Sequence, residues 1–200
     1  MSSKDLMSGK PQYDEPAVLA AAIEVFWRHG YAATSINELT AATGLSRSSL
    51  YQRFQDKDGL FLEALASYTE RVLQRMEGVQ AVTARTRLEA LLREFVPGDA
   101  KSRRPAGCLL ARSCAEIPLL SEAGQSAARA GVKRQKAIVE GILRSAAANG
   151  ELAAEADIEA LAWYYLGVVQ AILNLPQAGA SRAALQRMAD VAMSAWPAPR

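Results

Sequence analysis

Residues 35–54 read SINELTAATGLSRSSLYQRF and contain two short helical patterns on either side of a glycine. The first pattern opens with Ser35 and Glu38, which have the spacing of a capping box at the start of a helix. Gly44 ends that pattern, and Ser46 can cap the next helix. Two short helices joined by a glycine-containing turn are typical of a helix-turn-helix.

The second of these helices has an apolar face and a polar face. Leu50 and Phe54 are four residues apart and therefore share the inner face. This register turns four polar side chains outward: Arg47, Ser48, Tyr51 and Gln52. Such side chains reach phosphate oxygens and base edges. The pattern is equally compatible with DNA binding and with a three-helix core whose third helix is simply polar outside.

The rest of the chain indicates an all-α fold. Of its 200 residues, 39 are alanine, the best helix former and a poor strand former. No run of strand length alternates apolar and polar residues between turn signals. Capping residues and breaks predict about nine helices, close to residues 14–29, 35–43, 46–54, 56–77, 84–96, 106–116, 119–148, 156–175 and 180–195.

The helical pattern changes near residues 70–80, which indicates two regions. We expect a flexible arm at residues 1–12, an N-terminal helix-turn-helix module within residues 11–71 and a larger helical domain over residues 78–197. The fourth helix would carry the chain from the first region into the second.

Composition excludes several classes of protein. The formal net charge is +2 and half of the residues are apolar, which excludes general disorder. The longest apolar run, Leu161 to Val169, is about half of a membrane span, so we expect no membrane partner. Residues 1–10 lack the apolar region of a secretory signal. Two cysteines do not make a disulfide framework, so we expect a reducing cytoplasm.

Catalytic and metal-binding motifs are missing from the sequence. His29 is the single histidine, and it precedes a helix-stopping glycine, where a cation is favourable. There is no phosphate-binding loop, nucleophile elbow or His-Glu-x-x-His motif. We therefore expect no enzymatic activity, no metal site and no cofactor.

Three blocks of the N-terminal region resemble the tetracycline-repressor (TetR) family, without gaps from about Pro11 to Arg71. They are Phe26-x-x-x-Gly30-Tyr31-x-x-Thr34-Ser35-Ile36, Ala42-Thr43-Gly44-Leu45-Ser46 and Leu50-Tyr51-x-x-Phe54-x-x-Lys57-x-x-Leu60-Phe61. Thr40 and Thr43 stand where the family usually has alanine, a modest change in packing. The resemblance implies a homodimeric transcriptional regulator, most often a repressor. Such a regulator binds a palindromic double-stranded operator. It releases the operator when a small-molecule effector, whose identity the sequence does not give, occupies the C-terminal domain.

The resemblance also implies which residues contact DNA. They lie at the start of the second helix, along the third and at the start of the fourth: Thr34, Ser35, Arg47, Ser48, Ser49, Tyr51, Gln52, Arg53 and Lys57. Serine discriminates bases weakly, so base reading should rest on Arg47 and Gln52. An activator of the same fold, or a helical ligand-binding protein without DNA function, stays an alternative.

Cys108 and Cys114 leave two interpretations open. In the first interpretation, both cysteines are small apolar residues of the core. In the second, Cys108 is a reactive sensor of oxidants or electrophiles. A predicted position near a helix start and four basic neighbours favour the thiolate: Lys101, Arg103, Arg104 and Arg112. On one helix, a separation of six residues places the two thiols about 120° apart, so no disulfide closes without unfolding.

Residues 107–109, Gly-Cys-Leu, are similar to a TetR subgroup that includes the N-ethylmaleimide-reductase repressor, whose cysteine at this place senses electrophiles. That repressor is thought to use a lysine from a late helix, and this chain has none after Lys136. The competing model is an apolar ligand bound between the helices at 84–96, 106–116 and 119–148.

The late helix over residues 158–173 is apolar almost all round and must be buried on two sides. One side can face the core and the other a partner subunit, as the family's last two helices do. The final helix would add Leu185, Met188, Ala192 and Trp196. We expect Val169 and Met193 to point outward into this dimer interface.

Overall fold

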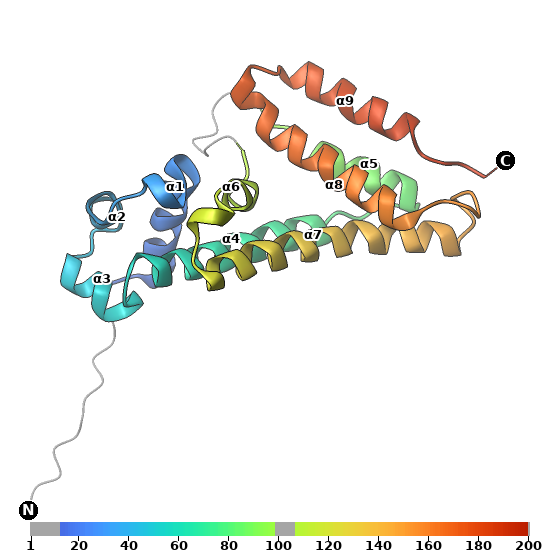
Figure 1. Cartoon of the computed structure of the whole chain (residues 1–200). Helices are drawn as coiled ribbons and strands as arrows, with labels where there is room; N and C mark the ends of the chain where they lie inside the picture. Colours follow the sequence, from blue (N-terminus) through green and yellow to red (C-terminus); the bar gives the residue numbers. More distant parts are fainter. Residues whose placement is uncertain (1–12, 99–106, 200) are drawn as a thin grey trace, which may run out of the picture.

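The structure, a computed structural model, describes residues 13–98 and 107–199, and within them the chain forms helices and no strands (Figure 1). The helices are α1 (Glu15–Ala33), α2 (Ile36–Thr43), α3 (Arg47–Phe54), α4 (Lys57–Glu77), α5 (Ala84–Glu94), α6 (Leu109–Ala115), α7 (Glu122–Ala148), α8 (Ile158–Asn174) and α9 (Arg182–Ser194). Short 3-10 turns follow α6 and α8: η1 (Ile117–Leu119) and η2 (Leu175–Ala178). The predicted all-α class is confirmed. The arm expected at residues 1–12 lies outside the described residues.

The predicted capping residues begin the first four helices. Asp14, Ser35, Ser46 and Asp56 each accept a backbone N–H of the first turn with a side-chain oxygen. Gly44 ends α2 with a φ of 71°, in the left-handed region that glycine adopts without strain. Local chemistry within three or four residues therefore fixes where each of these helices begins.

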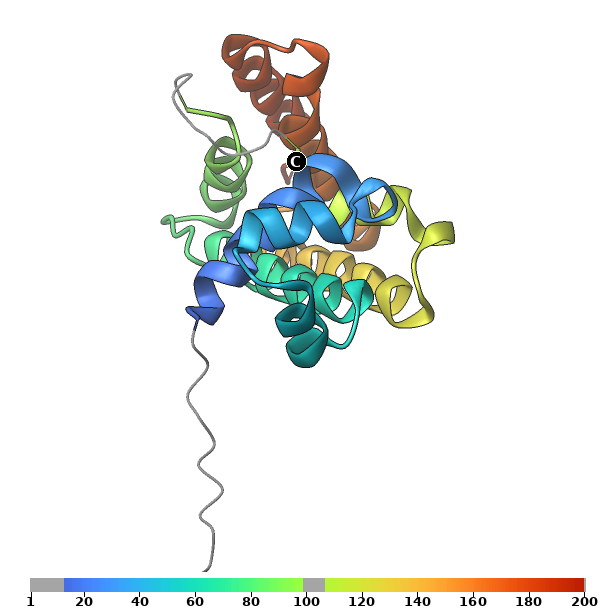
Figure 2. The same ribbon diagram turned by 90° about the vertical axis from the view of Figure 1, so that its left-hand side faces the viewer.

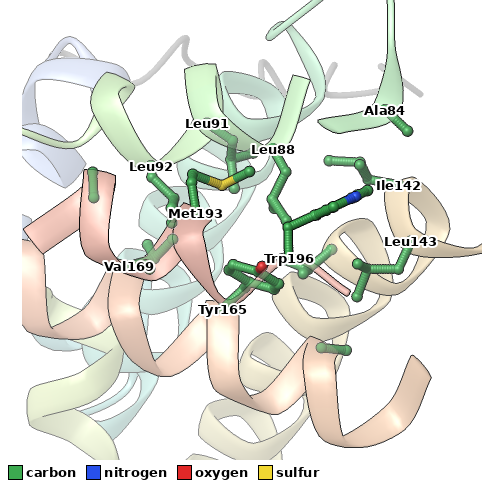
Figure 3. Close-up of a cluster of buried hydrophobic side chains, with 14 of the residues drawn as sticks. Ala84, Leu88, Leu91, Leu92, Ile142, Leu143, Tyr165, Val169, Met193 and Trp196 are labelled. Carbon is green, nitrogen blue, oxygen red and sulfur yellow. The ribbon is translucent and has the colours of Figure 1, made fainter. Parts of the chain in front are cut away.

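Two hydrophobic cores divide the molecule, and α4 contributes to both. The core nearer the N-terminus joins α1–α4 to α6 and includes Phe26, Leu50, Phe61 and Leu110. The second joins α5, α7, α8 and α9 around Tyr165, as Figure 3 shows. The two views agree that α1–α3 form one end of the molecule and α5, α8 and α9 the other (Figures 1 and 2).

A long-range cap ties α5 to the C-terminal segment. The carboxylate of Glu151 accepts the backbone N–H groups of Ala84 and Arg85, each at 3.1 Å. The carbonyl of Glu151 in turn accepts the indole N–H of Trp196 at 3.0 Å. The first turn of α5 therefore depends on residues about 70 and 110 positions later in the chain.

Three expectations about the C-terminal region were wrong. The helix predicted at 106–116 begins at Leu109, with Cys108 in extended backbone just before it. The helix predicted from 119 begins at Glu122, because η1 extends to Leu119 and Ser121 caps α7. Val169 and Met193 are buried within the monomer, so they do not face a partner. The outward face of α8 carries Trp163, Tyr164 and Gly167 instead.

A glycine on α7 allows close packing against α6 and α4. A Cβ on Gly131 would lie 2.8 Å from a methyl of Leu110 and 3.3 Å from the methyl of Thr69. Leu110 is fully buried, so its methyls have little room to move. Gly141 lies on the same helix, is exposed, and would meet nothing within 4 Å.

We expect Gly131→Ala and Gly141→Ala to change the free energy of unfolding in opposite directions. Overpacking at position 131 should lower the free energy of unfolding by roughly 1–3 kcal/mol. This exceeds the stabilisation that the higher helix propensity of alanine gives. Alanine at position 141 should stabilise the protein by about 0.5–1 kcal/mol through helix propensity alone. Urea unfolding of both variants measures this, and equal stabilisation of both would contradict the proposed packing.

Candidate nucleic-acid interface

The outward face of α3 carries the four side chains that the sequence predicted there. Arg47, Ser48, Tyr51 and Gln52 are all exposed, whereas Leu50 and Phe54 on the opposite face are buried. Tyr51 keeps 41% of its surface exposed, a large share for an aromatic residue. The structure thus brings charged, hydroxyl and amide groups together on one solvent-facing surface.

A hydrogen bond orients the arginine of this surface. The Arg47 guanidinium donates to Oδ1 of Asn37 on α2 at 2.9 Å. A guanidinium has five donors, so this bond fixes the side chain and leaves the remaining donors for an acceptor outside the protein. Sequence reasoning missed Asn37, because nothing in a local pattern pairs positions ten residues apart across a turn.

Ser35 and Ser46 place hydroxyl groups at two helix starts beside this surface. The Ser35 backbone N–H and hydroxyl both donate to the Glu38 carboxylate at 2.7 Å, which completes the predicted capping box. These bonds, first from the backbone and then from the side chain, lower the pKa of Glu38 below its usual range. The Ser46 hydroxyl lies 2.9 Å from those of Ser48 and Ser49. Ser49 is half-buried.

Lys57, the first residue of α4, is held by the turn that precedes α2. Its ammonium donates to the carbonyls of Tyr31 at 3.0 Å and Thr34 at 3.1 Å, and it lies 4.3 Å from the centre of the Tyr31 ring. An ammonium has three donors, so one is left for an anion, and a helix start favours an anion. Lys57 therefore holds the turn before α2, in addition to the DNA contact expected of it.

Thr34 and Arg53 direct their side chains into the protein. Thr34 is 2% exposed, and its hydroxyl donates to the carbonyl of Gly30 at 2.5 Å. Arg53 forms ion pairs with Glu63 at 2.8 Å and with Glu15, which lowers the pKa of Glu15. Arg53 thus joins α3 to α1 and α4, a positioning role that sequence reasoning missed because both partners are distant in the chain.

Gly59 sets how closely α3 and α4 approach. A Cβ at this position would lie 2.0 Å from the carbonyl oxygen of Phe54, the last residue of α3. Because that oxygen belongs to the backbone, no side-chain movement relieves the overlap. The glycine therefore fixes the angle at which the outward face of α3 is presented, and the spacing pattern of the sequence left this position unassigned.

Two cavities lie where α1 meets the C-terminal region, and Trp27 lines both. One, of about 340 Å³, is also lined by Cys108, Arg112 and Asn174. The other, of about 320 Å³, extends between α1, α4, α5 and α8 past Phe95. Neither of these two cavities is lined by α7, whereas the ligand space was expected between the helices at 84–96, 106–116 and 119–148. The indole N–H of Trp27 is buried and has no acceptor among the described residues.

Cys108 lies against Tyr68 and is 2% exposed. Burial, and next the neighbouring thiol, raises the pKa of Tyr68. Cys114 is half-buried, and burial raises the pKa of its thiol. Because Cys108 precedes α6, the two thiols are not on one helix as expected. Of the predicted basic neighbours Arg112 borders the same cavity, whereas Lys101, Arg103 and Arg104 lie outside the described residues.

The described part of the chain brings no three His, Cys, Asp or Glu side chains into an arrangement that could hold a metal ion.

Two family models match the chain. "Bacterial regulatory proteins, tetR family" matches residues 18–64, and "Tetracyclin repressor-like, C-terminal domain" matches residues 84–192. The chain is 28% identical to the transcriptional repressor ComR of Escherichia coli K12, over 94% of this chain and 92% of that protein. It is 32% identical to the uncharacterized regulator YezE of Bacillus subtilis 168, over 94% and 98% respectively.

Solved structures share the fold. A cysteine mutant of the TetR family transcriptional regulator CifR, complexed with 26-bp operator DNA, superposes with a TM-score of 0.82 at 32% identity. That alignment covers 94% of this chain and 100% of the CifR chain. Reduced NemR of E. coli has a TM-score of 0.76 at 19% identity, covering 92% and 98% respectively, which shows a likeness of fold alone.

Proposed function

Because the chain belongs to the TetR family of bacterial regulatory proteins, we propose that it represses transcription by binding operator DNA through α2 and α3. The observation that carries this is the outward polar face of α3, held on a helix-turn-helix. A relative with the same fold has been solved on its operator. Residues 11–71 would bind DNA, and residues 78–197 would bind an effector and a second subunit.

The groups on α3 suit different parts of a DNA groove. Arg47 and Gln52 can each form paired hydrogen bonds with base edges, so we assign base reading to them. The hydroxyls of Ser48, Ser49 and Tyr51 suit phosphate oxygens, as does the remaining donor of Lys57. The Ser35 hydroxyl would reach a phosphate only by exchanging the bond that it donates to Glu38. The buried hydroxyl of Thr34 leaves its backbone for such a contact, and Arg53 supports α3 through its ion pairs.

The second subunit would cover the outward face of α8 and α9. By length and composition Ile158–Ala178 is apolar enough to cross a membrane, yet only 28% of its most apolar window is buried in the monomer. Trp163 is 50% exposed and Val191 on α9 is 67% exposed. The other face of α8 packs in its own core (Figure 3), so we propose a homodimer and no membrane contact.

Release from DNA would follow when an effector shifts the population of dimer conformations. The cavity beside Cys108 favours a second possibility, in which that thiol reacts with an electrophile. In such a reaction the sulfur bonds to one carbon of an activated alkene, and the thiol proton ends on the other carbon. The protein would act in the cytoplasm, with no catalytic role, metal or cofactor.

Substitutions on α3 should separate base reading from phosphate contact. Arg47→Ala or Gln52→Ala should relax sequence preference and cost roughly 1–3 kcal/mol at the contacted base pair. Tyr51→Phe and Lys57→Ala should weaken specific and non-specific binding alike, and Lys57→Ala should lower the salt slope by about one. Gel shifts at several salt concentrations, on DNA from the chain's own promoter region and on scrambled DNA, measure these changes.

Lys133→Ala is the matched control, because it removes an equal charge from the exposed surface of α7, away from α1–α3. It should leave both the affinity and the sequence preference unchanged. Wild-type binding by all four α3 and α4 variants would refute these assignments.

Gly167→Glu should break the dimer without disturbing the monomer. Gly167 is exposed on the outward face of α8, and a Cβ there meets nothing within 4 Å. A buried charge in an interface expected to exceed ~2,000 Å² should give monomers without operator affinity. Gly141→Glu makes the same change at an equally open position on α7 and should stay dimeric. Sedimentation at micromolar concentration decides, and a monomeric wild type would contradict the proposal.

Thiol reagents should distinguish the two models of release. If Cys108 is the sensor, N-ethylmaleimide or an oxidant should release the wild type and Cys114→Ser from DNA, whereas Cys108→Ser stays bound. If a non-covalent ligand is the effector, the wild type should ignore both reagents. If Cys108→Ser and the wild type are released equally in the same gel shift, Cys108 is not the sensor and only packs in the core.

A further inference from the structure

Glu116, which follows α6, reaches from the C-terminal region into the DNA-binding module. Its Oε2 accepts the backbone N–H of Tyr31 at 2.7 Å. A Cβ on Gly30 would lie 2.5 Å from Oε1 and 2.7 Å from Oε2 of the same carboxylate. The carboxylate thus lies directly against the glycine backbone, and only a residue without a side chain permits this contact.

The backbone at Gly30 explains why this N–H needs an acceptor from elsewhere. Gly30 has φ 83° and ψ 175°, which breaks α1 and starts a new turn at Tyr31. The first N–H groups of a turn have no helical acceptor. A carboxylate satisfies such a group with a short, charge-assisted bond. Because Gly30 is buried, water is a poor substitute at this place.

The turn that receives Glu116 is the one that positions α2. Residues 31–34 run from the break in α1 to the cap of α2 at Ser35. Glu116 holds the N–H side of this turn from α6, and Lys57 holds its carbonyls from α4. The place of α6 relative to α1 therefore determines where α2 begins.

The same short helix also borders the cavity that contains Cys108. Cys108, Ala111, Arg112 and Ala115 have helical spacing and together line that cavity, opposite Trp27 of α1. A molecule held there would lie between α6 and Trp27 of α1. Glu116 spans the separation of α6 from α1, one residue beyond the end of the lining.

We propose that Glu116 is a positioning residue for operator binding: its bond to the Tyr31 N–H holds the helix-turn-helix module in the arrangement that fits DNA. Glu116 acts through the turn at residues 31–34 and touches no DNA itself. This inference rests on the proposed function and adds the contact through which the C-terminal region controls the module.

Three variants of the full-length protein test the contact on DNA from its own promoter region. Glu116→Ala removes the acceptor and Glu116→Asp shortens the side chain by one carbon, so both should bind DNA about 5- to 150-fold more weakly, the usual range of coupling between sites. Glu116→Gln keeps an acceptor oxygen at the same place and should recover most of the affinity. Glu155→Ala, at an exposed position between α7 and α8, is the control and should bind like the wild type.

The salt dependence separates this role from a DNA contact. The slope of affinity against salt should be unchanged in Glu116→Ala, because no phosphate contact is lost, whereas Lys57→Ala lowers it. A folded, dimeric Glu116→Ala with wild-type affinity would overturn the inference. If that variant does not fold, Glu116→Asp and Glu116→Gln decide, and equal affinities for the two would overturn it. A wild type that binds no DNA would instead contradict the proposed function itself.

Discussion

At Gly30 the backbone adopts φ 83° and ψ 175°, a conformation that other residues adopt only with strain, and α1 is broken there. The arrangement of the DNA-binding module depends on this break. It exposes the N–H that Glu116 accepts and places the carbonyl that Thr34 binds. It also sends the chain back across α4, where Lys57 holds the turn. The backbone conformation of this one residue thus helps to decide how α2 and α3 lie on the rest of the protein.

The features that sequence reasoning predicted correctly are local. Ser35, Ser46 and Asp56 cap helices through groups three residues away, and Leu50 and Phe54 share a face because a helix repeats every 3.6 residues. The contacts it missed join distant positions. Glu116 and Tyr31 are 85 residues apart, and Arg53 and Glu15 are 38 apart. No spacing rule links residues that meet only after the helices have packed.

The inward and outward sides of α8 could not be assigned from its sequence for a different reason. Periodicity identifies a buried face only when the opposite face is polar. Between Leu161 and Val169 every residue is apolar or glycine, so burial of Val169 and exposure of Trp163 follow from packing against α7 and α9. The same reasoning explains why Cys108 was placed on a helix: Leu109 and Leu110 continue an apolar pattern through it.

The cap on α5 has a consequence for the dynamics of the C-terminal region. The amide groups at the start of a helix usually exchange their hydrogens with solvent rapidly, because nothing in the helix protects them. Here the carboxylate of Glu151 protects those of Ala84 and Arg85, and Trp196 and Pro197 hold the Glu151 segment in place. Exchange at the start of α5 therefore requires the Glu151 carboxylate to move away, and we expect it to quicken when the C-terminal segment detaches.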